Sequence, residues 1–300
     1  MKKMLFIVNP VAGQRRILRF LPEVISIFNE GGFEVTIYTT TAPSSALRIV
    51  AERAADHDIV VCAGGDGTLN ETISGVLRSG TDVPIGYIPA GSTNDFAASL
   101  SLPNNIPQAA SAIVNGEPVS YDVGKFSNRY FSYVASFGAF TRVSYSTPQN
   151  TKNMLGHIAY LLEGIQELAQ IRSTHVRFEL EGETIEDDYI FGAVSNSTSV
   201  GGVLTLDPKQ VDMRDGKFEL LLVRMPKDAI ELRDCIQALK SQRYDCGVIT
   251  FRSVSSLTIY PDPAMPWTLD GEKAEGSEMI QITNLHHAIR LIRRKESGND

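Results

Sequence analysis

A short segment of this chain places three glycines, a carboxylate and a hydroxyl between an apolar run and a helix-like run. It reads Val61-Cys62-Ala63-Gly64-Gly65-Asp66-Gly67-Thr68-Leu69-Asn70-Glu71. Glycine permits sharp turns and lets the main chain approach a ligand closely. The N–H groups at the start of a helix bind anions. The segment therefore predicts a phosphate site, in which the Asp66 carboxylate needs Mg²⁺, a bridging water or a ribose hydroxyl beside it.

Three more loops with small or hydroxyl-bearing residues follow other predicted strands. They are Asn9–Gly13, Thr39–Thr41 and Gly91–Phe96. Each alone is typical of an ordinary turn. Because the carboxyl ends of parallel strands lie at one edge of a sheet, where open α/β sheets bind ligands, the four loops together favour a binding site. The sequence contains neither GxxxxGK[ST] nor GxGxxG at this place, so the residues alone predict a phosphate site without naming the nucleotide.

The elements that would position these loops alternate between strand and helix. Apolar periodicity predicts, in chain order, a strand at 4–8, a helix at 17–28, a strand at 33–37, a helix from 44 or 45 to about 55, a strand at 59–63, a helix at 69–77 and a strand at 84–88. This alternation is typical of a parallel sheet with right-handed crossovers.

After about Asp122 the pattern changes to short strands separated by turn residues. The predicted strands are 130–137, 176–180, 189–194, 218–223, 248–251, 256–260 and 279–282, with helices near 155–171 and 228–239. We therefore predict a Rossmann-like α/β domain at 1–122, joined by the C-terminal tail 284–300, and a mainly antiparallel β-sandwich domain at 123–283. For the tail, Ala288–Arg294 either returns to pack on the first domain or ends as a solvated basic terminus.

Composition excludes several functional classes. The net charge of −7 argues against a general nucleic-acid-binding protein. Three widely spaced cysteines indicate neither a disulfide framework nor a zinc site and favour a reducing cytoplasm. No apolar run is long enough to span a bilayer, so a lipid substrate would be met at the membrane surface, from the cytoplasmic side.

Four motifs together resemble the bacterial diacylglycerol kinase and lipid kinase family. They are NPVAG at 9–13, GGDGTLNE at 64–71, GSTNDFA at 91–97 and LDGE at 269–272. The resemblance covers nearly the whole chain and is strongest to the soluble diacylglycerol kinases of Gram-positive bacteria. It implies a nucleotide site between the α/β domain and the β-sandwich. It also implies ATP as phosphoryl donor, Mg²⁺, a lipid acceptor at the membrane surface and a homodimer.

The resemblance assigns roles to individual residues. Those that match ATP contacts are Asn9, Pro10, Val11, Ala12, Gly13, Thr40, Gly64, Gly65, Asp66, Gly67, Thr68, Leu69, Asn70 and Ser92. Asp66 and Asp95 match an acidic network that organises magnesium. Asp270 matches the catalytic base, with Glu272 beside it, although Asp270-Gly271 alone is more typical of a hairpin turn. A structural Mg²⁺ is implied at Asp215, with main-chain oxygens of Asp212 and Lys217.

The main hypothesis is therefore an ATP- and Mg²⁺-dependent kinase that converts diacylglycerol into phosphatidate by in-line phosphoryl transfer. The alternatives are the same chemistry on phosphatidylglycerol, undecaprenol or a sphingoid base, then an NAD kinase, then a nucleotide-binding regulator without catalysis. Retention of three acids, Asp66, Asp95 and Asp270, argues against the last of these.

Overall fold

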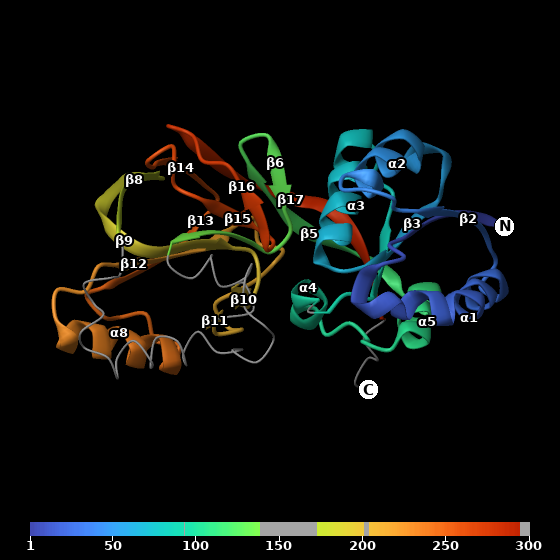
Figure 1. Ribbon diagram of the computed structural model, residues 1–300, viewed down its shortest axis with the longest axis horizontal. Coiled ribbons are helices and arrows are strands. Elements are labelled where there is room, and N and C mark those ends of the chain that lie inside the picture. Colours follow the sequence, from blue (N-terminus) through green and yellow to red (C-terminus); the bar gives the residue numbers. More distant parts are fainter. Residues whose placement is uncertain (93, 139–172, 201–203, 295–300) are drawn as a thin grey trace. The chain divides into compact units, whose positions relative to one another are not determined.

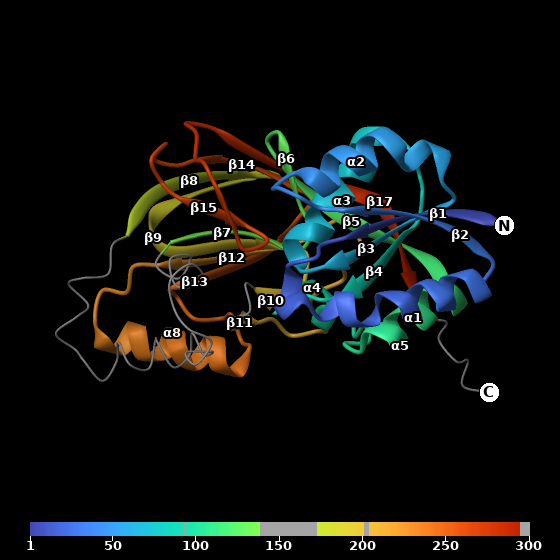
Figure 2. The same ribbon diagram turned by 45° about the vertical axis from the view of Figure 1, so that its right-hand side comes forward.

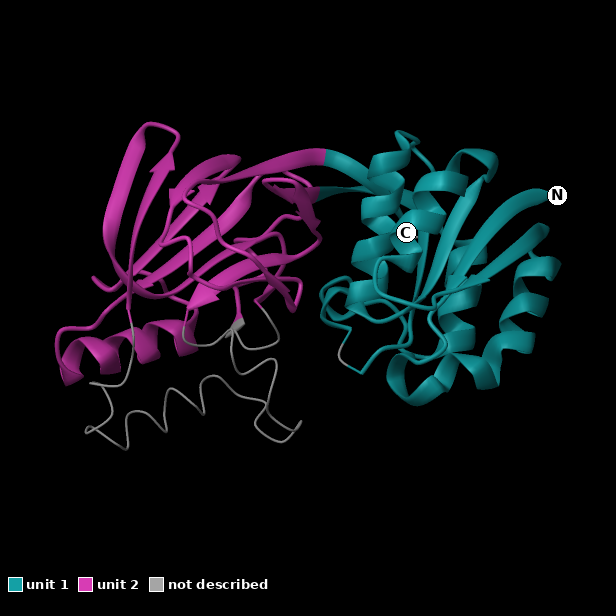
Figure 3. Cartoon of the chain, turned by 45° about the horizontal axis from the view of Figure 1, so that its top comes forward, with its two compact units in different colours: residues 1–122, 287–300 teal, residues 123–286 magenta. Residues whose placement is uncertain are grey.

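The computed structural model describes residues 1–92, 94–138, 173–200 and 204–294. The helix predicted near 155–171 lies outside these residues. The chain forms two compact units, residues 1–122 with 287–300 and residues 123–286 (Figure 3). Among the helices that the structure describes, none has the length and apolar character needed to cross a bilayer.

Unit 1 is built on a parallel sheet with the strand order β17-β4-β3-β1-β2 (Figure 1). Its strands are β1 (Lys2–Val8), β2 (Phe33–Thr39), β3 (Ile59–Gly64), β4 (Ile85–Pro89) and the C-terminal part of β17 (Ile280–Arg293). Every residue of β3 and β4 is buried. These central strands are almost continuously apolar because helices cover both faces of the sheet.

The helices of unit 1 form two layers. They are α1 (Arg16–Glu30), α2 (Ser45–Arg53), α3 (Asp66–Ser79), α4 (Asp95–Ser99) and α5 (Ile106–Asn115), with short 3-10 turns η1 (Ala12–Arg15) and η2 (Ala54–Asp56). Figures 1 and 2 show α2 and α3 on one face of the sheet and α1 and α5 on the other. The sequence analysis assigned no element to α5, which begins where the Asn105 side chain caps Gln108 N–H.

Unit 2 consists mainly of antiparallel strands, as predicted. They are the last part of β5 (Glu117–Phe126), which begins in unit 1, then β6 (Arg129–Phe131), β7 (Val134–Gly138), β8 (Thr174–Leu180), β9 (Glu183–Ser195), β10 (Ser199–Val200), β11 (Leu204–Thr205), β12 (Phe218–Arg224), β13 (Ile249–Val254), β14 (Ser256–Tyr260), β15 (Trp267–Leu269), β16 (Glu272–Ala274) and the first part of β17. The helix α8 (Ala229–Ser241) starts at Asp228, whose carboxylate accepts two main-chain N–H bonds.

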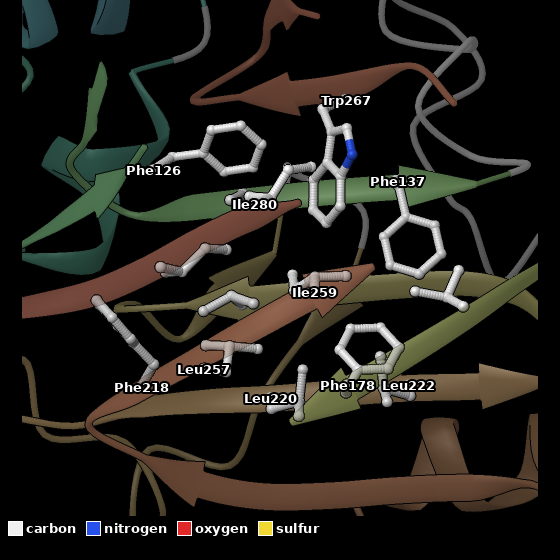
Figure 4. Packing of buried hydrophobic residues seen from close by; sticks show 14 of the residues in the cluster. Phe126, Phe137, Phe178, Phe218, Leu220, Leu222, Leu257, Ile259, Trp267 and Ile280 are labelled. Atoms are coloured by element: carbon white, nitrogen blue, oxygen red, sulfur yellow. The ribbon is translucent and has the colours of Figure 1, made fainter. Parts of the chain in front are cut away.

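Aromatic and aliphatic side chains from many strands of unit 2 pack into one core (Figure 4). The Trp267 ring lies between two phenylalanine rings, with centroids 5.1 Å from Phe126 and 5.0 Å from Phe137. Successive strand residues point to opposite faces, so Phe218, Leu220 and Leu222 of β12 enter this core together.

Three strand predictions were wrong in their limits. The strand predicted at 189–194 begins six residues earlier, at Glu183, as β9. The strand predicted at 130–137 is broken at Ser132–Tyr133, between β6 and β7, because main-chain N–H groups there bind a side chain instead of a neighbouring strand. The strand predicted at 279–282 continues as β17 to Arg293. Its end pairs with β4 through Leu291 and Ile85, so the tail does return to the first sheet.

Candidate functional site

Loops that follow β1, β3 and β4 meet at the carboxyl edge of the sheet in unit 1. The Asn9 side-chain amide donates to Thr68 Oγ1 at 3.0 Å and so ties the first loop to the start of α3. Gly13 has a φ of +48°, and a Cβ there would lie 1.9 Å from the Ala90 carbonyl oxygen. The first loop therefore packs directly on the end of β4. The convergence that the sequence analysis predicted is real within this unit.

The packing of the protein requires some of the glycines at this edge, but not all of them. A Cβ on Gly91 would lie 2.5 Å from Gly65 Cα, and a Cβ on Gly64 would lie 2.5 Å from Thr68 Cβ. Side chains at these two positions would force the loops apart. Gly65 itself differs, because its φ is −92° and the nearest atom to an added methyl group would be 3.4 Å away. The surrounding protein therefore accommodates a methyl group at Gly65.

The start of α3 offers main-chain N–H groups to a ligand. The residue before α3, Gly65, makes no side-chain cap, so the N–H groups of the first turn need partners from outside the helix. Leu69 N–H is bonded to Gly65 O, and the Leu69 side chain is buried in the core. Thr68 is also buried, with its hydroxyl held by Asn9. Of the predicted nucleotide residues, Leu69 and Thr68 thus shape the loop, and the N–H groups before them are the available donors.

Asp66 and Asp95 form a closely spaced pair of acids. The Asp66 carboxylate accepts the main-chain N–H groups of Asp95 at 3.1 Å and Phe96 at 3.2 Å, which fixes the start of α4. Burial raises the pKa of Asp66, although these N–H groups act in the opposite direction. Burial and then the neighbouring Asp66 charge raise the pKa of Asp95 to about 6. A cation beside the two carboxylates would relieve this repulsion, so the pair fits the magnesium that the resemblance implies.

The remaining predicted nucleotide residues surround the same edge. Thr40 follows β2 and donates its N–H to Val8 O at 2.9 Å. Val11 and Ser92 are exposed. Gly91 is held by Asn94, whose side chain accepts Gly91 N–H and donates to Gly91 O, both at 3.0 Å. Pro10 lies in the loop after β1, Ala12 begins η1, and Gly67 and Asn70 lie near the start of α3; all four are partly exposed.

Glu71 has a role that the sequence analysis did not assign. Its two carboxylate oxygens accept the main-chain N–H groups of Ser44 at 2.7 Å and Ala46 at 3.0 Å. These groups lie at the start of α2, so Glu71 satisfies donors that have no partner inside that helix. The last residue of GGDGTLNE therefore joins α3 to α2. Only the fold could reveal this contact, because 25 or more residues separate the partners.

In unit 2, Asp270 is both a turn residue and a buried carboxylate. Asp270 and Gly271 have φ values of +49° and +83° and connect β15 to β16 by a two-residue turn. The turn that its sequence favoured is therefore present. Yet Asp270 is only 5% exposed, and its carboxylate accepts three main-chain N–H groups, from Ser132, Tyr133 and Val134. The break between β6 and β7 supplies these donors and fixes both carboxylate oxygens.

A second layer of contacts supports the segment that holds Asp270. The Tyr133 carbonyl accepts Asn196 N–H at 2.8 Å and the Ser195 hydroxyl at 3.3 Å. Ser195 and Asn196 are both almost fully buried at the end of β9. Neither residue was predicted as part of a site. In the sequence, these residues could have been noticed because the polar run Ser195–Ser199 directly follows an apolar predicted strand.

Glu272 lies in a different environment from Asp270. It begins β16, its side chain is 57% exposed, and its carboxylate lies 3.9 Å from the Arg129 guanidinium. At this exposure and distance the ion pair adds little stability. The structure thus leaves Glu272 at the surface of unit 2, two residues after the buried acid.

The predicted structural metal loop precedes β12. Asp212 Oδ1 accepts Arg214 N–H at 3.0 Å, and Asp215 Oδ1 accepts Lys217 N–H at 2.9 Å. The side chain of Asn284 donates to the Lys217 carbonyl at 3.0 Å. All three predicted positions are at least partly exposed. The loop therefore presents carboxylate and carbonyl oxygens, the donor type that Mg²⁺ prefers.

Glu219 follows this loop and was not predicted as a site residue. It is the acid in the apolar strand Phe218–Arg224 and is only 2% exposed. Burial, and then the charges of Asp215 and Asp212, raise the pKa of Glu219 to about 8. In the sequence, this residue could have been noticed as the acid within the apolar run FELLLV. A buried carboxylate beside two more acids fits a nearby cation.

This pKa predicts how stability changes with pH in the metal-free protein. Folded Glu219 keeps its proton up to about pH 8, whereas the ordinary value is 4.5, so the folded state binds the extra proton between these limits. Stability contributed by Glu219 is therefore complete below pH 4.5 and is lost as pH rises through 8. We expect the free energy of unfolding of Glu219→Gln to rise relative to wild type by about 1.4 kcal/mol per pH unit in this window, reaching on the order of 5 kcal/mol.

Urea unfolding from about pH 4.5 to about pH 8.5 in the presence of a chelator measures the difference between the two proteins. A difference that stays constant across this range would contradict the prediction. The exposed Glu278→Gln serves as the control, because it removes the same charge outside the buried group.

Comparisons of sequence agree with this architecture. Residues 3–126 match the model of the diacylglycerol kinase catalytic domain, and residues 134–293 match that of the YegS C-terminal NAD kinase beta sandwich-like domain. The chain is 31% identical over 300 residues to a diacylglycerol kinase of Bacillus subtilis (strain 168), covering 99% of this chain and 98% of that protein. A diacylglycerol kinase of Staphylococcus carnosus is also 31% identical, covering 99% and 97%.

A comparison of structures gives the same result. A solved structure described as a putative diacylglycerol kinase from Bacillus anthracis superposes with a TM-score of 0.80, at 25% identity, covering 98% of this chain and 96% of that one. The α/β and β-sandwich fold class is thereby confirmed. Full-length relatives at this identity, together with both domain models, establish that the chain belongs to the diacylglycerol kinase family of lipid kinases.

Proposed function

We propose that this protein transfers the γ-phosphate of ATP to the free hydroxyl of diacylglycerol and releases phosphatidate. The observation that carries the proposal is the convergence of three loops on the uncapped start of α3. Main-chain N–H groups at a helix start, beside loops without side chains, suit the phosphates of a nucleotide. The choice of diacylglycerol rests on the names of the full-length relatives.

In the proposed reaction, unit 1 binds the phosphates and unit 2 supplies the base. The N–H groups before Leu69 and the loop 9–13 orient the triphosphate, and Thr40 and Ser92 lie at the same edge. Asp270 accepts the proton of the lipid hydroxyl as its oxygen attacks the γ-phosphate in line. The three N–H groups that fix its carboxylate keep the accepting oxygens in place without a change of rotamer. Glu272, at the exposed start of the following strand, is the second acid that the resemblance assigns to this site.

Magnesium would be held by Asp66 and Asp95 in unit 1 and by the loop Asp212–Lys217 in unit 2. When bound at the first position it offsets charge on the phosphates during transfer. The structural observation that fits this assignment is the contact of the Asp66 carboxylate with the main chain of Asp95 and Phe96, which brings the two acids together. We further propose that the protein works at the cytoplasmic face of the membrane as a peripheral enzyme and as a homodimer, in line with the resemblance.

The test is transfer of labelled γ-phosphate in mixed micelles with Mg²⁺, with one lipid alcohol in each reaction. We expect labelled phosphatidate from diacylglycerol in excess over the products from phosphatidylglycerol, undecaprenol and a sphingoid base. Soluble NAD is tested as a further acceptor. Label recovered in NADP would identify the protein as an NAD kinase instead of a lipid kinase. Binding of ATP without transfer to any acceptor would instead support a nucleotide-binding regulator.

A further inference from the structure

Glu219 is a buried acid whose charge no described group of the protein neutralises. It is 2% exposed, and its Oε2 atom is buried with no hydrogen-bond partner. None of the ion pairs formed by the described residues includes it. Because Phe218 and Leu220 on either side enter the core of unit 2, the Glu219 side chain points to the other face of β12. A carboxylate in this situation needs a partner that the described residues do not supply.

The residues nearest to Glu219 on that face do not satisfy it. Ser195 of β9 and Ser253 of β13 lie directly opposite in the strand register. The Ser195 hydroxyl is shared between the main-chain carbonyls of Ser197 at 2.8 Å and Tyr133 at 3.3 Å. The charged groups that act on Glu219 are Asp215 and Asp212, which carry the same sign. The neighbourhood therefore adds negative charge where a buried acid requires positive charge.

One further buried oxygen without a partner lies beside the same loop. Asn284 donates from its amide nitrogen to the Lys217 carbonyl, while its Oδ1 atom is buried without a hydrogen bond. The Lys217 carbonyl and the Asp215 carboxylate belong to the loop in which the proposed function places a cation. His286 packs on this loop, with Nδ1 3.2 Å from the position of a Cβ on Gly216. Carboxylate, carbonyl and amide oxygens together suit a hard divalent cation such as Mg²⁺.

We propose that Glu219 is a further ligand of the divalent cation held by the loop Asp212–Lys217, with its orphaned Oε2 directed to the ion or to a water bound to it. The inference rests on the metal assignment in the proposed function and adds a buried residue to it. The ion compensates the charges of Glu219 and Asp215. It also joins the loop to the buried face of β12 on which Glu219 lies.

The position of Glu219 gives such an ion a structural consequence. Glu219 pairs with Ser195, and Ser195 and Asn196 hold the Tyr133 carbonyl. Tyr133 in turn donates its N–H to Asp270. A cation at Glu219 therefore stiffens the strand end that supports the proposed base, without touching the substrate. Glu219 is in this sense a positioning residue.

The experiment measures metal binding without nucleotide or lipid. Protein stripped with a chelator is titrated with MgCl₂ by calorimetry, and its Tm is followed over the same range. All variants carry Asp95→Asn, so that the acid pair of unit 1 contributes less to the signal. We expect Glu219→Gln and Asp215→Asn each to weaken Mg²⁺ binding at least tenfold, as changes near metal ligands commonly do. The Tm gained on adding Mg²⁺ should shrink in the same two variants.

The matched control is Glu278→Gln, which removes a charge at an exposed position of unit 2 and should bind Mg²⁺ as the parent does. In chelator alone, Glu219→Gln should unfold at the same or a higher temperature than the parent. A lower Tm would mean that a donor of the protein satisfies Glu219 and would overturn the proposal. Unchanged Mg²⁺ affinity in Glu219→Gln, or no binding by the parent, would overturn it as well.

This outcome is separate from that of the kinase proposal. Mg²⁺ binding is measured without a phosphoryl acceptor, so a protein that fails to phosphorylate lipid can still confirm the role of Glu219. Conversely, Glu219→Gln could phosphorylate lipid and bind Mg²⁺ as wild type does. That result would overturn the role of Glu219 and leave the proposed kinase function standing.

Discussion

Asp270→Asn is expected to lower phosphoryl transfer to diacylglycerol by about 10²–10⁴-fold, the usual contribution of a general base. Asparagine keeps the shape of the side chain but cannot accept the proton of the lipid hydroxyl. ATP affinity should stay within about threefold of wild type, because the proposed phosphate loops belong to unit 1. Steady-state transfer of labelled phosphate and calorimetric titration with ATP measure the two quantities.

The carboxylate of Asp270 also has a structural task, so stability must be measured in parallel. Three main-chain N–H groups converge on its two oxygens. The asparagine amide nitrogen would face at least one of these donors, and an unsatisfied buried donor costs about 1–3 kcal/mol. Asp262→Asn is a suitable control, since the Asp262 carboxylate accepts the main-chain N–H of Ala264 in an exposed turn.

Two results would bear against Asp270 as the base. Transfer within tenfold of wild type would exclude that role. Transfer restored by lowering the temperature would assign the loss to unfolding, because a missing base is missing at every temperature. A large loss at full folding and unchanged ATP affinity supports the proposed role.

Gly65→Ala is expected to reduce ATP affinity by at least tenfold while leaving the free energy of unfolding within about 0.5 kcal/mol of wild type. The protein has room for this methyl group, since the nearest atom would be Gly91 Cα at 3.4 Å and φ is −92°. A ligand whose phosphate lies against the main chain has no such room. Tenfold in affinity corresponds to about 1.4 kcal/mol, which one displaced phosphate contact readily exceeds.

Gly91→Ala gives the contrasting result in the same loops. A Cβ there would lie 2.5 Å from Gly65 Cα and 2.7 Å from Asn94 Oδ1, so the fold itself should lose about 1–3 kcal/mol. The comparison separates a glycine needed by the ligand from one needed by the protein. Gly247→Ala in unit 2 is the neutral control, because nothing lies within 4 Å of its Cβ position. ATP affinity unchanged in Gly65→Ala would remove this turn from the nucleotide site.

The sequence by itself determined most of the α/β unit. Continuous apolar runs such as Ile59–Gly64 and helical spacing such as that in Arg16–Glu30 are local patterns, and local patterns decide which face of an element is buried. The loops after β1, β3 and β4 could be placed at one edge because parallel strands share an edge for their carboxyl ends. The motifs added the family, which both domain models and full-length relatives then showed.

Only the tertiary structure decided the contacts between distant residues. Glu71 caps a helix that precedes it in the chain, and Asp270 is held by N–H groups 136 to 138 residues away. The break at Ser132–Tyr133 could not be predicted, because its apolar neighbours favour an unbroken strand and the competing carboxylate lies far along the sequence. The same holds for Glu219. The sequence shows that an acid lies within an apolar strand. Its burial without a partner depends on β9, β13 and the loop at Asp215, which come together only in the folded unit.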